Sequence, residues 1–179
     1  MNTITKNLSL SLLLTLLSVG VANAKAGKEE KAEKEDGRPP IGCYNSGYQF
    51  ELEALHLLPG GNGQNQSMYF LFNTLGQPVN LFQMRDEESS RSMYLNHVIG
   101  PHEWGILSTN EKKVKFICSV PNKKSPYGQV VDCAQTLRVC EYTNVRYGLN
   151  NRGNYWLANS STRNGAVSAV VHYGIIPGM

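Results

Sequence analysis

The chain has 179 residues, with 41% hydrophobic and 17% charged positions, 17 glycines and 8 prolines. These proportions are typical of one globular domain and exclude collagen-like and fully disordered chains. Residues 41–179 carry a net charge of only +2, from 11 basic and 9 acidic side chains. This charge is too small to indicate a basic surface for nucleic acid, so we expect no nucleic-acid partner.

Residues 1–24 have the features of a secretory signal peptide. Lys6 precedes an apolar run from Leu8 to Val21, and Ala22-Asn23-Ala24 supplies the small residues that a signal peptidase requires. The run has 14 residues, fewer than the roughly 20 that cross a bilayer, so an uncleaved membrane anchor is the less favoured alternative. We predict cleavage after Ala24, a periplasmic or secreted location, and no transmembrane span after signal removal.

Residues 25–40 are predicted to form a charged flexible linker. Lys and Glu alternate from Lys25 to Asp36 with only Ala and Gly between them, and Gly37-Arg38-Pro39-Pro40 stops any helix. Without large apolar side chains, the segment does not offset its ordering entropy by burial. A transient helix and an interaction arm are the alternatives that we favour less.

Residues 41–179 are predicted to form an all-β domain. Apolar and polar residues alternate from Tyr48 to Ala54, with Leu52 on the apolar face, and again from Lys113 to Val120. The other predicted strands are Met68–Asn73, Val79–Met84, Met93–Ile99, Trp104–Ser108, Leu137–Tyr142, Val145–Tyr147, Asn154–Ala158 and Ala166–Tyr173.

The spacing of these strands, near ten residues with turn residues between, indicates an antiparallel β-sandwich of about eight or nine short strands. A barrel is the alternative architecture. Pro121 to Gly128 is predicted to be a loop, and a single helix is compatible with Asp86 to Met93.

Four cysteines, at positions 43, 118, 133 and 140, follow the export signal, so two disulfides are the default expectation. Three pairings are possible, and the sequence alone does not choose among them. We favour Cys118 with Cys133, because they bracket a turn-rich connection that can fold back as a hairpin. Cys43 then pairs with Cys140. A redox or metal role is less favoured, since no C-x-x-C is present.

Candidate catalytic chemistry is sparse. His97, His102 and Glu103 lie close in sequence, and imidazole with carboxylate can bind a divalent metal or act as a base. Their spacing is not that of H-E-x-x-H, so we favour a polar loop. His56 and His172 lie on predicted strands, where single histidines are usually packed or surface residues.

A candidate recognition site lies near Asn150 to Gly153, which has the composition of a tight hairpin tip. Tyr155 and Trp156 alternate across the next strand, so one is expected to face the core and the other to face outward. An exposed aromatic ring beside Asn151 and Arg152 is suited to stack on a sugar or to contact a partner loop. The alternative, which we favour, is a hairpin with a core Trp.

The late strands also carry a resemblance to a known family. It is carried by residues Leu137–Arg146, Asn151–Trp156 and His172–Ile176. Over residues 113–176 the chain resembles the enhanced-entry protein EnhB family, small secreted proteins of bacteria that invade host phagocytes. The resemblance implies an exported factor linked to entry into host cells, and it implies no catalytic residue and no particular ligand.

Two classes of function follow from these patterns. The first is a non-enzymatic protein, without a cofactor, that binds a protein or glycan partner in the bacterial envelope or on host cells. The second is a periplasmic hydrolase or metal-dependent enzyme that acts on cell-wall polymers through His97, His102 and Glu103. We favour binding, because the sequence contains no recognisable nucleophile or metal-binding motif.

Overall fold

The structure is a computed structural model, and it describes residues 37–59, 67–84, 93–109, 111–142 and 154–172. Within these residues the elements, in chain order, are β1 (Cys43–Tyr44), β2 (Tyr48–Glu51), β3 (Ala54–Leu57), β4 (Ser67–Asn73), β5 (Val79–Met84), β6 (Met93–Ile99), β7 (Trp104–Thr109), β8 (Val114–Asn122), β9 (Ser125–Val131), α1 (Cys133–Thr136), β10 (Leu137–Tyr142), β11 (Asn154–Ser160) and α2 (Arg163–His172).

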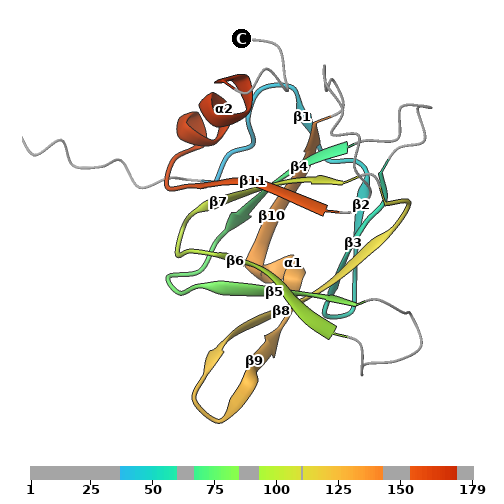
Figure 1. The fold of residues 1–179 in the computed structure, drawn as a ribbon, viewed down its shortest axis with the longest axis vertical. Coiled ribbons are helices and arrows are strands. Elements are labelled where there is room, and N and C mark those ends of the chain that lie inside the picture. The colour runs from blue at the N-terminus through green and yellow to red at the C-terminus, as the bar shows by residue number, and fades with distance from the viewer. Residues whose placement is uncertain (1–36, 60–66, 85–92, 110, 143–153, 173–179) are drawn as a thin grey trace, which may run out of the picture. The chain divides into compact units, whose positions relative to one another are not determined.

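The strands form two antiparallel sheets, which confirms the predicted β-sandwich (Figure 1). Sheet A has the strand order β1-β10-β4-β7-β11. Sheet B has the order β2-β3-β8-β5-β6, and β9 pairs with the far half of β8. The eleven strands of the described residues exceed the expected eight or nine, because β1 was not predicted and because β3 and β9 each complete a hairpin that was not predicted.

The main core lies between the sheets. Alternate residues of the central strands face inward, so that Tyr69, Leu71 and Leu107 of sheet A meet Leu81 and Phe116 of sheet B. All five side chains are fully buried. This inter-sheet core is the one that the period-two pattern of the sequence predicts.

A second core covers the outer face of sheet A. Met68, Phe70 and Trp104 point away from sheet B and pack against Ala166 and Val170 of α2. The prediction of a strand from Ala166 to Tyr173 is therefore wrong over the residues described. Valine-rich composition favours a strand, but the spacing of residues 166, 167, 170 and 171 places one apolar stripe on a helix. Thr162 caps this helix by accepting a hydrogen bond from the Gly165 backbone N–H at 3.0 Å.

Residues 48–57 form a hairpin and not one strand. Leu52 was expected on the apolar face, but it lies in the turn between β2 and β3 with a φ of +52° and is 92% exposed. The change of direction lets Leu55 and Leu57 enter the inter-sheet core after the chain has reversed.

The predicted loop from Pro121 to Gly128 is also a hairpin. β8 continues to Asn122, Lys123 and Lys124 turn the chain, and β9 returns along β8 from Ser125. The register shifts between Val120 and Asn122, where Pro121 has no N–H to donate. The helix considered for Asp86 to Met93 lies outside the described residues except for Met93, which begins β6.

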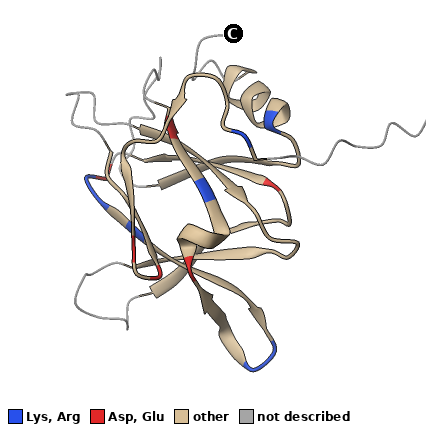
Figure 2. Cartoon of the chain, turned by 180° about the vertical axis from the view of Figure 1, so that it is seen from behind, with Lys and Arg blue, Asp and Glu red and all other residues tan. Residues whose placement is uncertain are grey.

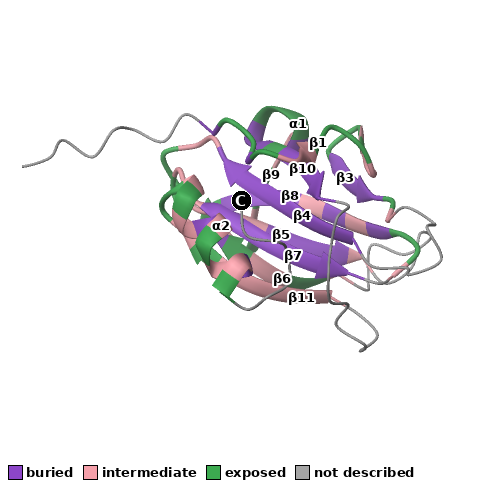
Figure 3. Ribbon diagram, turned by 90° about the horizontal axis from the view of Figure 1, so that it is seen from above, coloured by how far each residue is buried: buried purple, intermediate pink, exposed green. Residues whose placement is uncertain are grey.

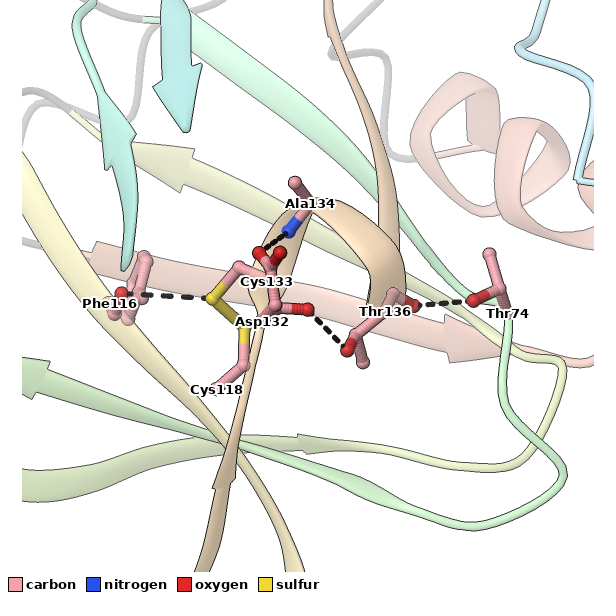
Figure 4. The surroundings of a disulfide bond; sticks show 7 residues. All are labelled: Thr74, Phe116, Cys118, Asp132, Cys133, Ala134 and Thr136. Atoms are coloured by element: carbon pink, nitrogen blue, oxygen red, sulfur yellow. Dashed lines mark hydrogen bonds between the residues drawn. A yellow bond between two sulfur atoms is a disulfide. The ribbon is translucent and has the colours of Figure 1, made fainter. Parts of the chain in front are cut away.

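Both predicted disulfides are confirmed. Cys118 on β8 pairs with Cys133 in α1, and their Cα atoms are 5.4 Å apart. Asp132 caps this short helix by accepting from the Ala134 N–H at 2.9 Å, as Figure 4 shows. Cys43 pairs with Cys140 at a Cα separation of 5.5 Å and ties β1 to β10. Two disulfides are typical of a protein from an oxidising compartment.

A buried carboxylate anchors the segment that follows β1. Glu141 is only 3% exposed, and it accepts hydrogen bonds from the hydroxyls of Ser67 at 2.6 Å and Ser46 at 3.0 Å. Tyr69 donates to the Gly47 carbonyl at 2.7 Å, and burial together with the Glu141 charge raises the pKa of this phenol. These bonds hold the segment before β2 against sheet A.

The segments before β1 lie mostly outside the described residues. The predicted signal peptide, residues 1–24, and most of the predicted linker therefore stay predictions. Gly37 and Pro40, at the end of that linker, are buried, and Gly37 lies against the ring of Phe72. Across the described ranges, no helix is long and apolar enough to cross a membrane.

The two disulfides should contribute unequally to stability. Cys43–Cys140 closes a separation of 97 residues and Cys118–Cys133 one of 15. In the chain-entropy model these loops correspond to about 4 to 5 kcal/mol and about 3 kcal/mol. Urea denaturation should therefore give a larger loss for Cys43→Ala with Cys140→Ala than for Cys118→Ala with Cys133→Ala. The opposite order would show that native packing, and not loop closure, dominates.

Gly47 should tolerate no side chain. Its φ is +68°, and a Cβ there would overlap the Glu141 carboxylate. We expect Gly47→Ala to lower the free energy of unfolding by about 2 kcal/mol or more. Gly76→Ala is the matched control, because the nearest atom to a Cβ at Gly76 is His102 Nε2 at 3.8 Å. Equal losses in the two variants, measured by thermal unfolding, would contradict this account of the anchor.

Candidate functional site

The candidate site lies where the edge strands of the two sheets, β6 of sheet B and β11 of sheet A, face each other across the open side of the sandwich. Side chains from these strands and from β5 bridge the gap and form one hydrogen-bonded group. Figure 3 shows β6 and β11 at the same side, largely intermediate or exposed, beside the buried strands β4 and β7. We call it the amide–aromatic cluster, and it consists of Gln83, Tyr94, Asn96, His97, Asn154, Trp156 and Asn159.

A bulge in β6 assembles the cluster. Leu81 pairs with His97 and Phe82 pairs with Leu95, so the register skips Asn96. In a regular strand, Asn96 and His97 would point to opposite faces. The extra residue lets both side chains reach β11. A second irregularity skips Leu157 on β11, next to Trp156.

Gln83 is the polar centre of the cluster. It is 5% exposed, and its Oε1 accepts from Tyr94 OH at 2.7 Å, Asn96 Nδ2 at 2.8 Å and Asn154 Nδ2 at 2.6 Å. Asn96 Oδ1 accepts in turn from the Trp156 indole N–H. One carbonyl oxygen thus collects donors from both edge strands and joins the sheets through polar contacts.

His97 and Trp156 form a stacked pair. Their ring centroids are 3.7 Å apart and the planes differ by 6°. His97 Nε2 lies 2.7 Å from Asn159 Oδ1, while Asn159 Nδ2 donates to the Val98 carbonyl at 3.0 Å. Burial lowers the pKa of His97, and the bond to Asn159 opposes this shift in part. A neutral imidazole that donates from Nε2 leaves Nδ1 as its acceptor nitrogen.

The cluster contains acceptors without donors. Asn154 Oδ1 is buried and has no hydrogen-bond partner among the described residues. Within these residues, the other buried side-chain polar atom without a partner is Trp104 Nε1, in the second core. His97 Nδ1 also has no hydrogen-bond partner within these residues, but it is not a buried atom. A buried acceptor without a partner costs free energy. The cluster is therefore suited to a neutral molecule that donates hydrogen bonds and offers a face to aromatic rings.

The structure separates the three residues considered for catalysis. His97 belongs to the cluster, whereas His102, with a φ of +54°, and Glu103 lie in the turn between β6 and β7. The described part of the chain contains no group of three or more His, Cys, Asp or Glu residues that could hold a metal ion. His97 and Trp156, which the sequence treated as members of different sites, are the pair that the fold brings together.

The predicted recognition residues divide between two faces. Trp156 pairs with Leu107 and packs partly against the inter-sheet core, and Tyr155 pairs with Ser108 on the opposite face of sheet A. This is the alternation expected from the sequence. Asn151 and Arg152 lie outside the described residues.

Sequence reasoning missed the amides of the cluster. Gln83, Asn96 and Asn159 lie on strands that hold other polar residues as well, so the pattern does not mark them. The available signal was Gln83, a polar side chain at an inward position of β5 after Val79 and Leu81. The bulge that gathers its partners has no glycine or proline to mark it.

Comparisons with known proteins give no relative. No family model, no curated protein and no solved structure matches the chain. The resemblance to the enhanced-entry protein EnhB family therefore stays a prediction.

His97 should make stability depend on pH. Because its pKa is lower in the folded than in the unfolded chain, its contribution to stability is complete above about pH 6.5 and is lost as the pH falls through the folded value. Urea midpoints at pH 7.5 and pH 5.0 should therefore differ less in His97→Gln than in the unmodified protein. His102→Asn, in the turn outside the cluster, should keep the full difference. An unchanged difference in His97→Gln would contradict the prediction.

Proposed function

We propose that this protein is an exported, non-enzymatic binding protein, and that the amide–aromatic cluster holds its partner. The observation that carries the proposal is the pair of acceptors, Asn154 Oδ1 and His97 Nδ1, that have no donor beside two stacked rings. Export to the periplasm or beyond is supported by the apolar run after Lys6 and by the two disulfides.

A glycan is the partner that this chemistry supports best. Sugar hydroxyls donate hydrogen bonds to neutral acceptors, and the apolar face of a sugar ring stacks on aromatic side chains. The side chains of the cluster are amides, two aromatic rings and a histidine whose lowered pKa favours the neutral form. None of these side chains is charged when His97 is neutral, and the carboxylate in contact with them, that of Glu111, accepts from Gln83 Nε2 at 3.4 Å.

The biological role that we propose is attachment of this kind in the bacterial envelope or on a host cell, in support of bacterial entry. The resemblance of Leu137–Arg146 and Asn151–Trp156 to the enhanced-entry protein EnhB family is the ground for this part of the proposal. A hydrolase that acts through His97, His102 and Glu103 gains no support from the described residues, because His97 is engaged by Trp156 and Asn159.

A glycan array probed with the purified protein should detect a neutral oligosaccharide. Asn154→Ala should weaken that binding about fivefold to tenfold, as expected for the loss of one hydrogen bond. The melting temperature should fall only modestly, because Gln83 Oε1 keeps its bonds from Tyr94 and Asn96. Asn164→Ala, an exposed asparagine on α2, is the matched control and should bind like the unmodified protein. The glycan assignment would be refuted if the two variants weakened glycan binding equally, or if the purified protein bound proteins but no glycan.

A further inference from the structure

The β8–β9 hairpin and the two residues before it concentrate the positive charge of the described residues. From Lys112 to Val131 there are five lysines and no Asp or Glu. The remaining described residues carry three arginines and six acidic side chains. The segment is thus +5 while the rest of the described chain is −3, and the tip of the hairpin is coloured as basic in Figure 2. A net charge over the whole chain conceals this asymmetry.

The outer face of sheet B carries an apolar patch beside this charge. Directly paired residues of antiparallel strands share a face. One row across four strands runs from Val98 through Asn80 and Ser119 to Val130. Val98 is 37% exposed and Val130 is 43% exposed.

A second row of the patch runs from Leu95 through Phe82 to Ile117. Tyr127 of β9 packs its ring on Phe82, with the centroids 5.9 Å apart. Leu95 and Tyr127 are 51% and 55% exposed, respectively. The second row and Tyr127 therefore form an apolar strip over β6, β5 and β8. Val98 and Val130 lie beside it, with the polar Asn80 and Ser119 between them. On sheet A, α2 covers the outer face.

The charges that border the strip are basic. Lys115 lies on the same outer face, paired with Met84 and His56, and Lys123 with Lys124 forms the turn between β8 and β9. An acidic residue, Glu51, ends the row of Leu95, Phe82 and Ile117 at strand β2, and its carboxylate lies 3.4 Å from His56 Nε2. Lys123 and Lys124 thus lie in the β8–β9 turn away from Glu51, whereas Lys115 lies beside the Glu51–His56 pair.

We infer that this face binds the surface of a bilayer that contains anionic phospholipid. Lysine side chains interact with anionic headgroups while their aliphatic stems lie along apolar surface. A tyrosine is favoured at the level of the headgroups. A soluble polyanion would use the lysines, but it would gain nothing from Leu95, Val98 and Val130, and for this reason we favour the bilayer. The inference does not depend on the glycan proposal, because the cluster faces inward from β6 and this strip faces outward.

Vesicle co-sedimentation tests the inference. The exported protein is purified and its N-terminus sequenced, so that the run from Leu8 to Val21 does not contribute to binding. Equal mixtures of phosphatidylglycerol and phosphatidylcholine should sediment the protein at low salt, and phosphatidylcholine alone should sediment little. Lys123→Gln with Lys124→Gln should lower the partition coefficient about 25-fold, at about fivefold for each lysine.

Leu95→Ser with Val130→Ser should also weaken vesicle binding, by about tenfold, through loss of apolar contact. Arg138→Gln, an exposed basic residue on β10 of sheet A, is the charge control and should leave binding unchanged. Melting temperatures verify that each variant is folded. The inference would be overturned if the protein did not bind anionic vesicles, or if Arg138→Gln weakened binding as much as the lysine variant. It would also be overturned if Leu95→Ser with Val130→Ser left vesicle binding unchanged and the protein bound soluble heparin equally well.

Discussion

The burial of sheet A on both faces is the constraint on which the rest of the structure depends. Tyr69 and Leu71 of β4 face sheet B. Phe70 and Phe72 alternate with them along β4 and point to the other face, where Trp104 pairs with Phe72. This other face needs a separate cover. An apolar sheet face exposed to water is unfavourable, so the chain places α2 there. The Cys43–Cys140 bridge lies on this same side, with Cys140 fully enclosed in the second core. Among the described residues, sheet B has no such second core, and its outer face keeps exposed apolar side chains.

The same architecture explains why polar side chains gather at one side of the sandwich. Where two sheets end in edge strands, the inter-sheet core is open to water. Here the opening between β6 and β11 is closed by Gln83 and its donors, and by the indole of Trp156 against His97. Asn159 covers part of the β6 edge by donating to the Val98 carbonyl. Closing the opening with amides leaves hydrogen-bonding capacity that aliphatic residues would not have, and this capacity is what a ligand can use.

Sequence patterns predicted the inter-sheet core well, because period-two alternation follows directly from strand geometry. β5 and β6 have the predicted bounds, and the disulfide pairing followed from the short Cys118 to Cys133 connection. The failures have physical causes. Leu52 adopts a positive φ that leucine rarely takes, so the sequence did not predict a turn there. Valines in α2 favour strands, and only tertiary packing against Trp104 and Phe72 selects the helix. The bulge at Asn96 depends on partners from β5 and β11 that are distant in sequence.

Strand β6 takes part in both proposed surfaces, and its geometry keeps them separate. Tyr94 and His97, together with the bulged Asn96, point toward β11 and the cluster, whereas Leu95 and Val98 point outward from sheet B. The two surfaces also differ in charge, since the cluster is built from amides and aromatic rings and the strip is bordered by lysines. A neutral hydroxyl-rich ligand requires hydrogen-bonding and aromatic side chains, and an anionic surface requires lysines and apolar side chains. Because side chains alternate along β6, its two faces present these two sets separately, and neither set of contacts requires β6 to move.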